Sequence, residues 1–468
     1  MYDASEKLIE FTSDNLAEKI GNVVPIDEER LKYEIKEYIW PRLDFLSGGK
    51  NGTKRYFIFE ENYIETEWKD MISIHYINTS YWVNNAVMRI HIFVEKRISE
   101  TNYVGFFTLR KIDEPRMMLS YIYPNWSVIS YESRPVCAMT YRKTVHIAGN
   151  TISFPTYPLF VQDNITIACA QASMVAMTQY LHHKFDYKKI RIKELGNAFF
   201  SGKTKLFPSA GLLPTQMIEI FNYYDIPIDY KAFNMKNDLS REEEEGEYER
   251  YRQYIDYSIE SGIPVILGIA ITEVDNKKNI QKRHILQIIG HTAQNRKMYV
   301  VYDDSGCFLK DLNAKNGFVV PVDWNDLKRY IKNRNSFIIF PIHEKVYLLL
   351  DDFKNIFCEM YNKISTLRQL TDDKMASPEK TRYFLADNRD VKAFVKQNVY
   401  NIPEIEEEIK DLLNRNMAHF VWCAEVPVRN GYILYLADPT YGKLTTKNIF
   451  YNTIPLFSKK QFGILNYK

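Results

Sequence analysis

The stretch DNITIACAQASMVAMTQYL, residues 163–181, contains the cysteine on which the interpretation of this sequence depends. Its first part holds β-branched Ile and Thr, which favour extended backbone, and its second part is rich in Ala and Met, which favour a helix. Cys169 therefore falls at the predicted start of a helix. Backbone N–H groups and the positive end of a helix dipole stabilise a thiolate at such a position. Cys169 is thus a candidate nucleophile; the alternative is a structural cysteine, because free cysteines are among the most buried residues.

A cysteine nucleophile needs a base, and His284 is the candidate. It opens the predicted strand HILQIIG (284–290) directly after a charged turn, where we expect it to be accessible. Asp303 ends the next predicted strand, MYVVYD (298–303). If the two strands form a hairpin, His284 and Asp303 lie at the same end of the sheet, where a carboxylate can orient the imidazole. Asp304 is the alternative carboxylate, and strand alternation predicts that only one of the two can serve.

Acyl transfer also needs a site for the oxyanion. Backbone N–H groups at the start of the predicted helix can supply one donor, and the second donor is commonly a side-chain amide. Gln162 and Asn164 precede Cys169 in the extended approach and are the two candidates.

Composition excludes several classes of protein. The chain has 468 residues, of which 46% are hydrophobic and 26% charged, the balance of a folded protein with two to four domains. The formal charge is only +2, so nothing indicates a nucleic acid or a charged membrane as partner. No window approaches the ~20 apolar residues of a membrane span.

The cysteines and the first residues predict a compartment. The start, MYDASEKLIEFTSDNLAEKI (1–20), contains acidic residues and no apolar core typical of a secretory signal. The five cysteines are an odd number, widely spread and without a CxxC motif. These features predict a cytoplasmic protein with free thiols and no zinc site. No phosphate-binding or dinucleotide-binding glycine motif is present. No metal or organic cofactor is expected.

The order of the predicted elements gives an α+β fold in three parts. Residues 1–152 form a helical segment followed by a β-rich accessory module, in which MISIHYIN (71–78) is one of the predicted strands. Residues 153–344 place helices first and an antiparallel type of sheet second. Residues 345–468 form an α+β accessory domain, in which SPEKTRYFLADNRD (377–390) is predicted to be a linker.

The central part resembles a known family. QDNITIACAQASMVAMTQYL (162–181) is similar to the nucleophile segment of papain-like cysteine peptidases, especially the bacterial subgroup that includes the bacteriocin-leader-processing peptidases. GIPVILGIAI (262–271), RHILQIIGHT (283–292) and MYVVYDDSG (298–306) resemble the second half of that fold, over about residues 157–342 in all. The resemblance implies a helical half and an antiparallel sheet half.

The same resemblance implies roles for individual residues. Cys169 matches the nucleophile, His284 the general base, Asp303 the orienting carboxylate and Gln162 the oxyanion-hole amide. The implied activity is hydrolysis of a peptide bond in a peptide or protein substrate, with the flanking domains available to a protein partner.

The sequence departs from the family pattern after the nucleophile. Ala170 and Gln171 stand where the family has Gly-Pro, and Asp304 follows Asp303 in place of the usual Pro. Two alternatives therefore stay open: a non-proteolytic acyltransferase or amidase on the same fold, and a catalytically inactive binding or regulatory protein. Substrate preference, oligomeric state and biological pathway are not specified by the residues.

A weaker pattern occurs near the C-terminus. His419 opens a predicted strand and Asp438 ends the next one, which repeats the order of His284 and Asp303. No cysteine at a helix start precedes them, since Cys358 lies inside a helical stretch. The pattern is interpreted as one hairpin of the accessory domain.

Overall fold

The computed structural model of the chain describes residues 7–24, 26–40, 54–74, 84–111, 117–124, 136–162, 169–195, 211–233, 240–275, 278–292, 298–305, 318–331, 336–368, 381–398, 406–428, 431–441, 450–451, 456–458 and 460–462. The chain divides into two units. The first unit comprises Met1–Lys236 and Pro264–Phe340, and the second comprises Asn237–Ile263 and Pro341–Lys468.

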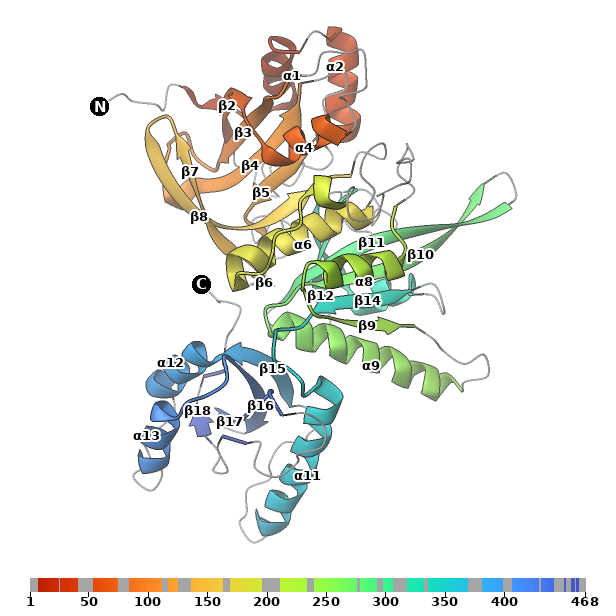
Figure 1. The fold of residues 1–468 in the computed structure, drawn as a ribbon. Helices are drawn as coiled ribbons and strands as arrows, with labels where there is room; N and C mark the ends of the chain where they lie inside the picture. Colours follow the sequence, from red (N-terminus) through yellow and green to blue (C-terminus); the bar gives the residue numbers. More distant parts are fainter. Residues whose placement is uncertain are drawn as a thin grey trace. The chain divides into compact units, whose positions relative to one another are not determined.

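The first sheet of the first unit comes from the N-terminal third of the chain (red to yellow-orange in Figure 1). Its strand order is β1-β2-β3-β4-β5-β8-β7, with antiparallel neighbours throughout. Every residue of β3 and β4 is buried, so both faces of the sheet centre are covered. The strands are β1 (Ile9–Glu10), β2 (Tyr56–Tyr63), β3 (Val87–Phe93), β4 (Tyr103–Arg110), β5 (Leu119–Ile122), β7 (Tyr141–Ile147) and β8 (Asn150–Phe160).

Short helices accompany this sheet. Thr12 caps the start of α1 and Asp27 caps the start of α2, each by accepting backbone N–H bonds. The helical elements are α1 (Ser13–Gly21), α2 (Glu28–Glu34), the π-helical turn η2 (Ile35–Ile39), α4 (Thr66–Ile74) and the 3-10 turn η5 (Glu100–Asn102). The predicted strand 71–78 is wrong over its described residues, because α4 covers residues 71–74. Trp68 and Met71 are both buried at the three-residue spacing of a helix face.

The second sheet of this unit has the strand order β13-β12-β11-β10-β14-β9, and β6 also pairs with β11. β10 and β11 form a long antiparallel hairpin, and β12 pairs with the far part of β11. The strands are β6 (Val136–Ala138), β9 (Ile228–Ala232), β10 (Val265–Asp275), β11 (Lys278–Thr292), β12 (Met298–Tyr302), β13 (Val319–Asp323) and β14 (Phe337–Pro341). The short helices α8 (Pro214–Tyr223) and α10 (Trp324–Lys328) belong to the same unit.

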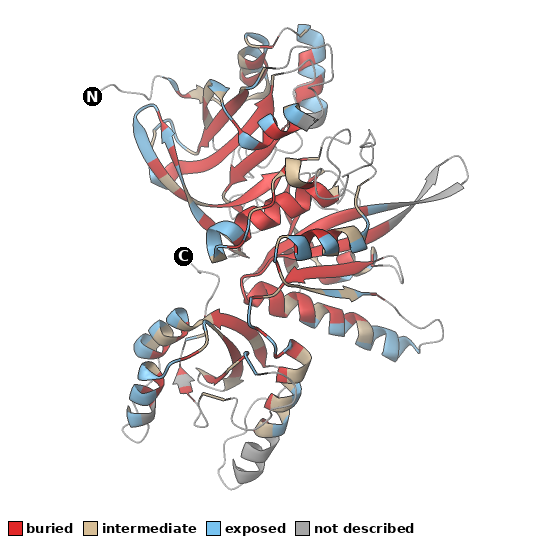
Figure 2. Ribbon diagram, viewed as in Figure 1, coloured by how far each residue is buried: buried red, intermediate tan, exposed pale blue. Residues whose placement is uncertain are grey.

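One long helix, α6 (Cys169–Phe185), lies between the two sheets of the first unit. All residues from 170 to 181 are buried, and the helix is red over most of its length in Figure 2. It packs against β8 of the first sheet and β11 of the second. A helix that is buried around its whole circumference belongs in a core.

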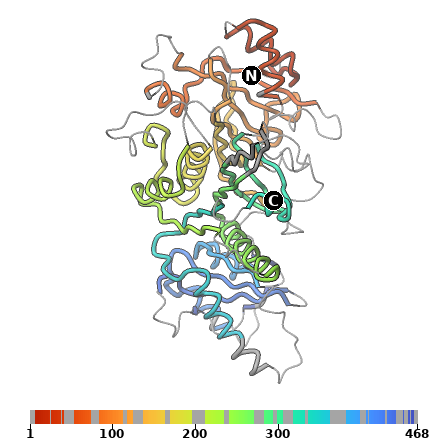
Figure 3. Tube along the Cα trace, turned by 90° about the vertical axis from the view of Figure 1, so that its right-hand side faces the viewer, coloured from red at the N-terminus to blue at the C-terminus, as the bar shows by residue number. Residues whose placement is uncertain are grey.

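The second unit is built around the four-stranded antiparallel sheet β15-β16-β17-β18. The helix α9 packs against β15, and both views of the chain place it there (Figures 1 and 3). Ser240 and Glu243 form a capping box at its start, and Gly262, with a φ of 71°, follows its end. The elements are α9 (Arg241–Glu260), α11 (Leu350–Arg368), β15 (Arg382–Asp387), α12 (Asn388–Asn398), α13 (Glu406–Asn414), β16 (Phe420–Val428), β17 (Gly431–Ala437) and β18 (Leu456–Ser458).

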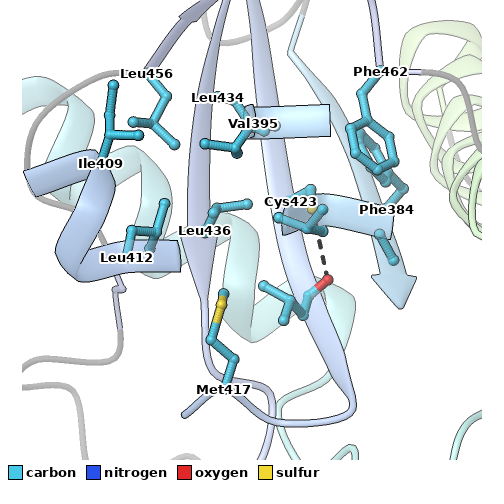
Figure 4. Close-up of a cluster of buried hydrophobic side chains, with 13 residues drawn as sticks. Phe384, Val395, Ile409, Leu412, Met417, Cys423, Leu434, Leu436, Leu456 and Phe462 are labelled. Carbon is cyan, nitrogen blue, oxygen red and sulfur yellow. Dashed lines mark hydrogen bonds between the residues drawn. The ribbon is translucent and has the colours of Figure 1, made fainter. Parts of the chain in front are cut away.

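The core of the second unit lies between its sheet and the helices α12 and α13. Figure 4 shows aliphatic and aromatic side chains from these elements gathered around Cys423, whose thiol contacts the carbonyl oxygen of Val421 at 3.7 Å. Burial raises the pKa of the Cys423 thiol well above its usual value, so this cysteine is unreactive core filling. The predicted linker 377–390 is wrong, because it contains β15, whose side chains Phe384 and Ala386 belong to this core.

The predicted α+β class with antiparallel sheets is confirmed. The predicted domain boundaries at residues 152 and 344 stay a prediction. The two compact units divide the chain differently, because α9 belongs to the same unit as the C-terminal residues. Over the described parts of the chain, no helix combines the length and apolar character needed to cross a membrane.

Candidate active site

Cys169 is the first residue of α6, so the predicted start of the helix is confirmed. Its side chain is half-buried, whereas the following residues of the helix are buried. The first N–H groups of a helix have no partner within the helix, and the dipole is positive there. The start of α6, where Cys169 lies, is therefore a place at which backbone N–H groups can bind an anion.

His284 does not open a strand, contrary to the prediction. It lies inside β11, opposite Ile269 of β10, and it is only 6% exposed instead of accessible. The difference arises because the charged segment before it continues the strand from Lys278 instead of forming a turn. The predicted hairpin is confirmed, since β11 pairs with β12 and Gln287 stands opposite Tyr302.

This register brings the imidazole to a carboxylate and to the thiol. Nε2 of His284 lies 2.9 Å from Oδ1 of Asp303, the residue that follows β12. The His284 ring also hydrogen-bonds the side chain of Cys169. A carboxylate only accepts, so Nε2–H donates to Asp303, and we infer that Nδ1 faces the thiol. The structure therefore brings together Cys169, His284 and Asp303 from three separate elements.

Asp304 also faces the imidazole, so the prediction that only one carboxylate can do so is wrong. Its Oδ1 lies 3.5 Å from Nε2 of His284, and both carboxylates are 1% exposed. Strand alternation does not apply here, because β12 ends at Tyr302 and a turn follows. Ser305 belongs to that turn and donates its N–H, at 3.0 Å, and its hydroxyl, at 2.7 Å, to Oδ1 of Asp303.

The charges of the site stabilise one another. Burial alone would lower the pKa of His284, but hydrogen bonds to Asp303 and Cys169, with the negative charge of Asp303 and Asp304, raise it well above its usual value. Burial alone would raise the pKa of Asp303. The hydrogen bond from His284, the charge of His284 and the two hydrogen bonds from Ser305 lower that pKa. The contacts around His284 therefore favour the imidazolium over the neutral imidazole.

The same groups offer a possible set of metal ligands. One ligand atom each from His284, Asp303 and Asp304 lies within 4.8 Å of the others, a spacing that suits a divalent cation. Oδ1 of Asp303, however, already receives the bonds from His284 and Ser305. The described contacts therefore fit a proton on Nε2 of His284, hydrogen-bonded to Asp303, better than a cation between these three side chains.

The predicted oxyanion amides are not brought to the thiol by any described contact. Gln162 lies two residues beyond the end of β8 and is half-buried. Asn164 and the connection from Gln162 to α6 lie outside the described residues. The role of Gln162 therefore stays a prediction.

Sequence reasoning missed three residues that surround the site. Ser305 hydrogen-bonds the carboxylate of Asp303. Gln287 and Tyr157 connect β11 with β8, because the Tyr157 hydroxyl donates to Oε1 of Gln287 at 2.6 Å. The turn residues DDSG gave a signal for Ser305, since a serine two residues after an aspartate commonly bonds its carboxylate. Gln287 and Tyr157 lie within apolar strands, where nothing in the local sequence marks them.

The C-terminal pattern is not a second site of the same kind. His419 pairs with Asp387 at 3.1 Å and is exposed. Asp438 accepts instead from the Tyr451 hydroxyl at 2.7 Å. The interpretation as an accessory hairpin agrees with β16 and β17, which pair directly.

The described residues include the cysteines Cys137, Cys169, Cys358 and Cys423, and none of these four forms a disulfide bond. Cys307 lies outside the described residues. The sequence matches no family model and no curated protein sequence. The resemblance to papain-like peptidases therefore remains one of local sequence, now accompanied by the geometry around Cys169.

Proposed function

We propose that this protein is a papain-like cysteine peptidase that hydrolyses a peptide bond in a peptide or protein substrate. The observation that carries the proposal is the position of the His284 imidazole, which hydrogen-bonds Cys169 at the start of a helix and Asp303 after a neighbouring strand. Nucleophile, base and orienting group are thus arranged in the order that thiol acyl transfer requires.

In the proposed reaction the Cys169 thiolate attacks the substrate carbonyl carbon and forms a C–S bond. The tetrahedral intermediate collapses as the C–N bond breaks, and the His284 imidazolium gives its proton to the leaving amine. His284, now neutral, then takes a proton from water, whose oxygen attacks the thioester. Breaking the C–S bond releases the acid and restores the thiolate beside the imidazolium. Asp303 keeps Nε2–H oriented throughout.

The oxyanion of each tetrahedral intermediate would be held by the start of α6. A helix N-terminus directs backbone N–H groups at an anion, and the Cys169 N–H is the natural first donor. Gln162 is proposed as the second donor on the strength of the family resemblance.

The departure from Gly-Pro after the nucleophile does not by itself oppose activity. Ala170 and Gln171 are 2% and 8% exposed, so the interior of the fold accommodates their side chains. An inactive binding protein would not need a buried imidazole held between a thiol and two carboxylates. Burying such a group is costly unless it is fully paired, which supports a retained site.

The direct test compares two half-buried cysteines, Cys169 and Cys358. Alkylation by iodoacetamide at pH 6.5 should modify Cys169 much faster than Cys358, because only a thiolate reacts efficiently and Cys169 lies at a helix start beside an imidazole, whereas Cys358 lies inside α11. Cys169→Ala should abolish cleavage of a peptide library monitored by mass spectrometry, while Cys358→Ala should retain it. Equal alkylation rates together with cleavage by Cys169→Ala would rule the proposal out.

Two additions to the assay separate the alternatives. Added hydroxylamine or an acceptor amine should trap an acyl group if the enzyme is an acyltransferase, whereas a peptidase should mainly release the acid. Activity should survive a chelator such as EDTA. Loss of activity on chelation, restored by Zn²⁺, would favour a metal at His284, Asp303 and Asp304 in place of the thiol mechanism.

A further inference from the structure

Gln287 joins the two elements that carry the reacting groups. It lies on β11, three residues after His284, and it is completely buried. Its Nε2 donates to the carbonyl oxygen of Ser173 at 2.7 Å. Ser173 lies four residues after Cys169, about one turn along α6. The bond therefore connects the thiol-bearing helix with the imidazole-bearing strand close to the point where thiol and imidazole meet.

The other end of the Gln287 amide is also fixed. Its Oε1 accepts the hydroxyl of Tyr157 at 2.6 Å, and Tyr157, on β8, is completely buried. A side-chain amide that is bonded at both ends has no freedom to rotate, so α6, β8 and β11 are held in one arrangement. These bonds are direct contacts within the first unit.

A second set of hydrogen bonds connects β12 with β8. The hydroxyl of Tyr302, which stands opposite Gln287 in the sheet, accepts the Phe160 N–H at 2.7 Å and donates to the Phe160 carbonyl oxygen. Tyr302 directly precedes Asp303, and Phe160 ends β8, two residues before Gln162. The strand that positions the carboxylate is therefore tied to the strand that leads into the nucleophile segment.

We propose that Gln287 is a positioning residue, which sets the separation between the Cys169 thiol and the His284 imidazole by bonding Ser173 on α6 and Tyr157 on β8. This inference rests on the proposed function, because it concerns the same thiol and imidazole. It differs from a merely structural role, in which Gln287 would contribute to stability and leave the chemistry of the thiol unchanged.

The chain offers a matched control in Gln179. It is also a glutamine, it lies on α6, and it is only 3% exposed. Its amide donates to the Tyr121 hydroxyl of β5, ten residues further along the helix than Cys169. Gln179→Leu therefore removes a buried hydrogen bond made by a side-chain amide of α6, and it leaves the hydrogen bond between Gln287 and Ser173 in place.

The experiment measures the rate of alkylation of Cys169 at pH 6 and at pH 9 in the full chain, with the modified peptide quantified by mass spectrometry. At pH 9 thiols ionise without help, whereas at pH 6 a thiolate depends on the nearby imidazolium. Gln287→Leu should lower the pH 6 to pH 9 rate ratio by about 10- to 100-fold, because a shift of about 1 Å in a reacting pair has effects of this size. Gln179→Leu should leave that ratio within about twofold of the wild-type value, since it does not touch that pair.

Each outcome decides one question. Equal rate ratios for Gln287→Leu, Gln179→Leu and the wild type would overturn the positioning role, even if both variants unfold at lower temperature. A wild-type Cys169 that is no more reactive than Cys358 at pH 6 would instead contradict the proposed function. If Gln287→Leu does not fold, Tyr157→Phe replaces it, since it removes one hydroxyl and keeps the ring. A lowered ratio in Tyr157→Phe supports the proposal, and an unchanged ratio overturns it.

Discussion

At the scale of single residues, the unusual feature is a histidine with two carboxylates beside the same ring nitrogen. Asp303 is at hydrogen-bond distance from Nε2, and Asp304 lies 0.6 Å further away, at 3.5 Å against 2.9 Å. Asp303 also receives both bonds from Ser305, which fix its orientation. We expect Asp303 to orient the imidazole and Asp304 to act through its charge.

This assignment predicts different effects for Asp303→Asn and Asp304→Asn. Both changes remove negative charge that raises the pKa of His284, so both should lower that pKa. The imidazolium is then lost at lower pH, and the alkaline limb of kcat/KM should move to lower pH in both variants. Asp303→Asn should in addition reduce kcat by about 100-fold or more, because the orienting bond is lost.

The measurement is a pH profile of peptide cleavage for the two variants and the wild type. Asp304→Asn should keep kcat near the wild-type value at its own optimum, since the 2.9 Å bond to Asp303 remains. If Asp304→Asn loses kcat and Asp303→Asn does not, the roles of the two residues are reversed.

At the scale of elements, β11 is the strand on which the site depends, because it pairs with β10, β12 and β6. The pairing of β11 with β12 has a register shift between Ile288 and Gly290, and β6 pairs with β11 from Gly290 to Thr292. A Cβ atom at Gly290 would lie 2.0 Å from the backbone oxygen of Cys137 on β6. Glycine is therefore required at this position by the close approach of another strand.

Gly290→Ala should destabilise the first unit by about 1–3 kcal/mol or more, because the contact is with backbone that cannot rotate away. Gly246→Ala is the control. Gly246 is an exposed residue of α9 with nothing near its Cβ position, and alanine there should stabilise by about 0.5–1 kcal/mol. Chemical denaturation and hydrogen exchange of peptides from β6 and β11 measure both effects. Unchanged exchange in Gly290→Ala would contradict the close approach of β6.

At the scale of the molecule, the chain leaves the first unit after Lys236 and returns to it at Pro264. The segment between contains α9, which is held by the C-terminal residues of the second unit. Glu260 pairs with Arg382 at 2.7 Å, and Arg382 also pairs with Glu425 at 2.9 Å. These three side chains are buried, and Tyr257 stacks on Trp422 with ring centroids 5.0 Å apart.

A fragment of residues 1–344, cut at the predicted domain boundary, should therefore lose the packing of α9. The fragment lacks Arg382 and Trp422, so Glu260 loses its ion-pair partner and Tyr257 loses the ring on which it stacks. Limited proteolysis with mass spectrometry should show cleavage within residues 241–263 in the fragment and protection in the full chain. Equal protection in both would show that α9 folds independently of the C-terminal residues.

The local sequence determined much of this protein. The start of α6 at Cys169, the end of α9 at Gly262 and the order of His284 and Asp303 along a hairpin follow from local propensity and turn chemistry. The contact between His284 and Asp303 could be predicted because a hairpin fixes register over a short loop.

Only the tertiary structure decided the rest. Contacts between distant segments decide the burial of His284 and the position of the second carboxylate, Asp304. They also decide the two hydrogen bonds that Gln287 makes to Tyr157 and Ser173, and the grouping of α9 with the C-terminal residues. Such contacts leave no periodic pattern in the sequence, because a buried polar side chain in an apolar strand is defined by the partner that folding brings to it.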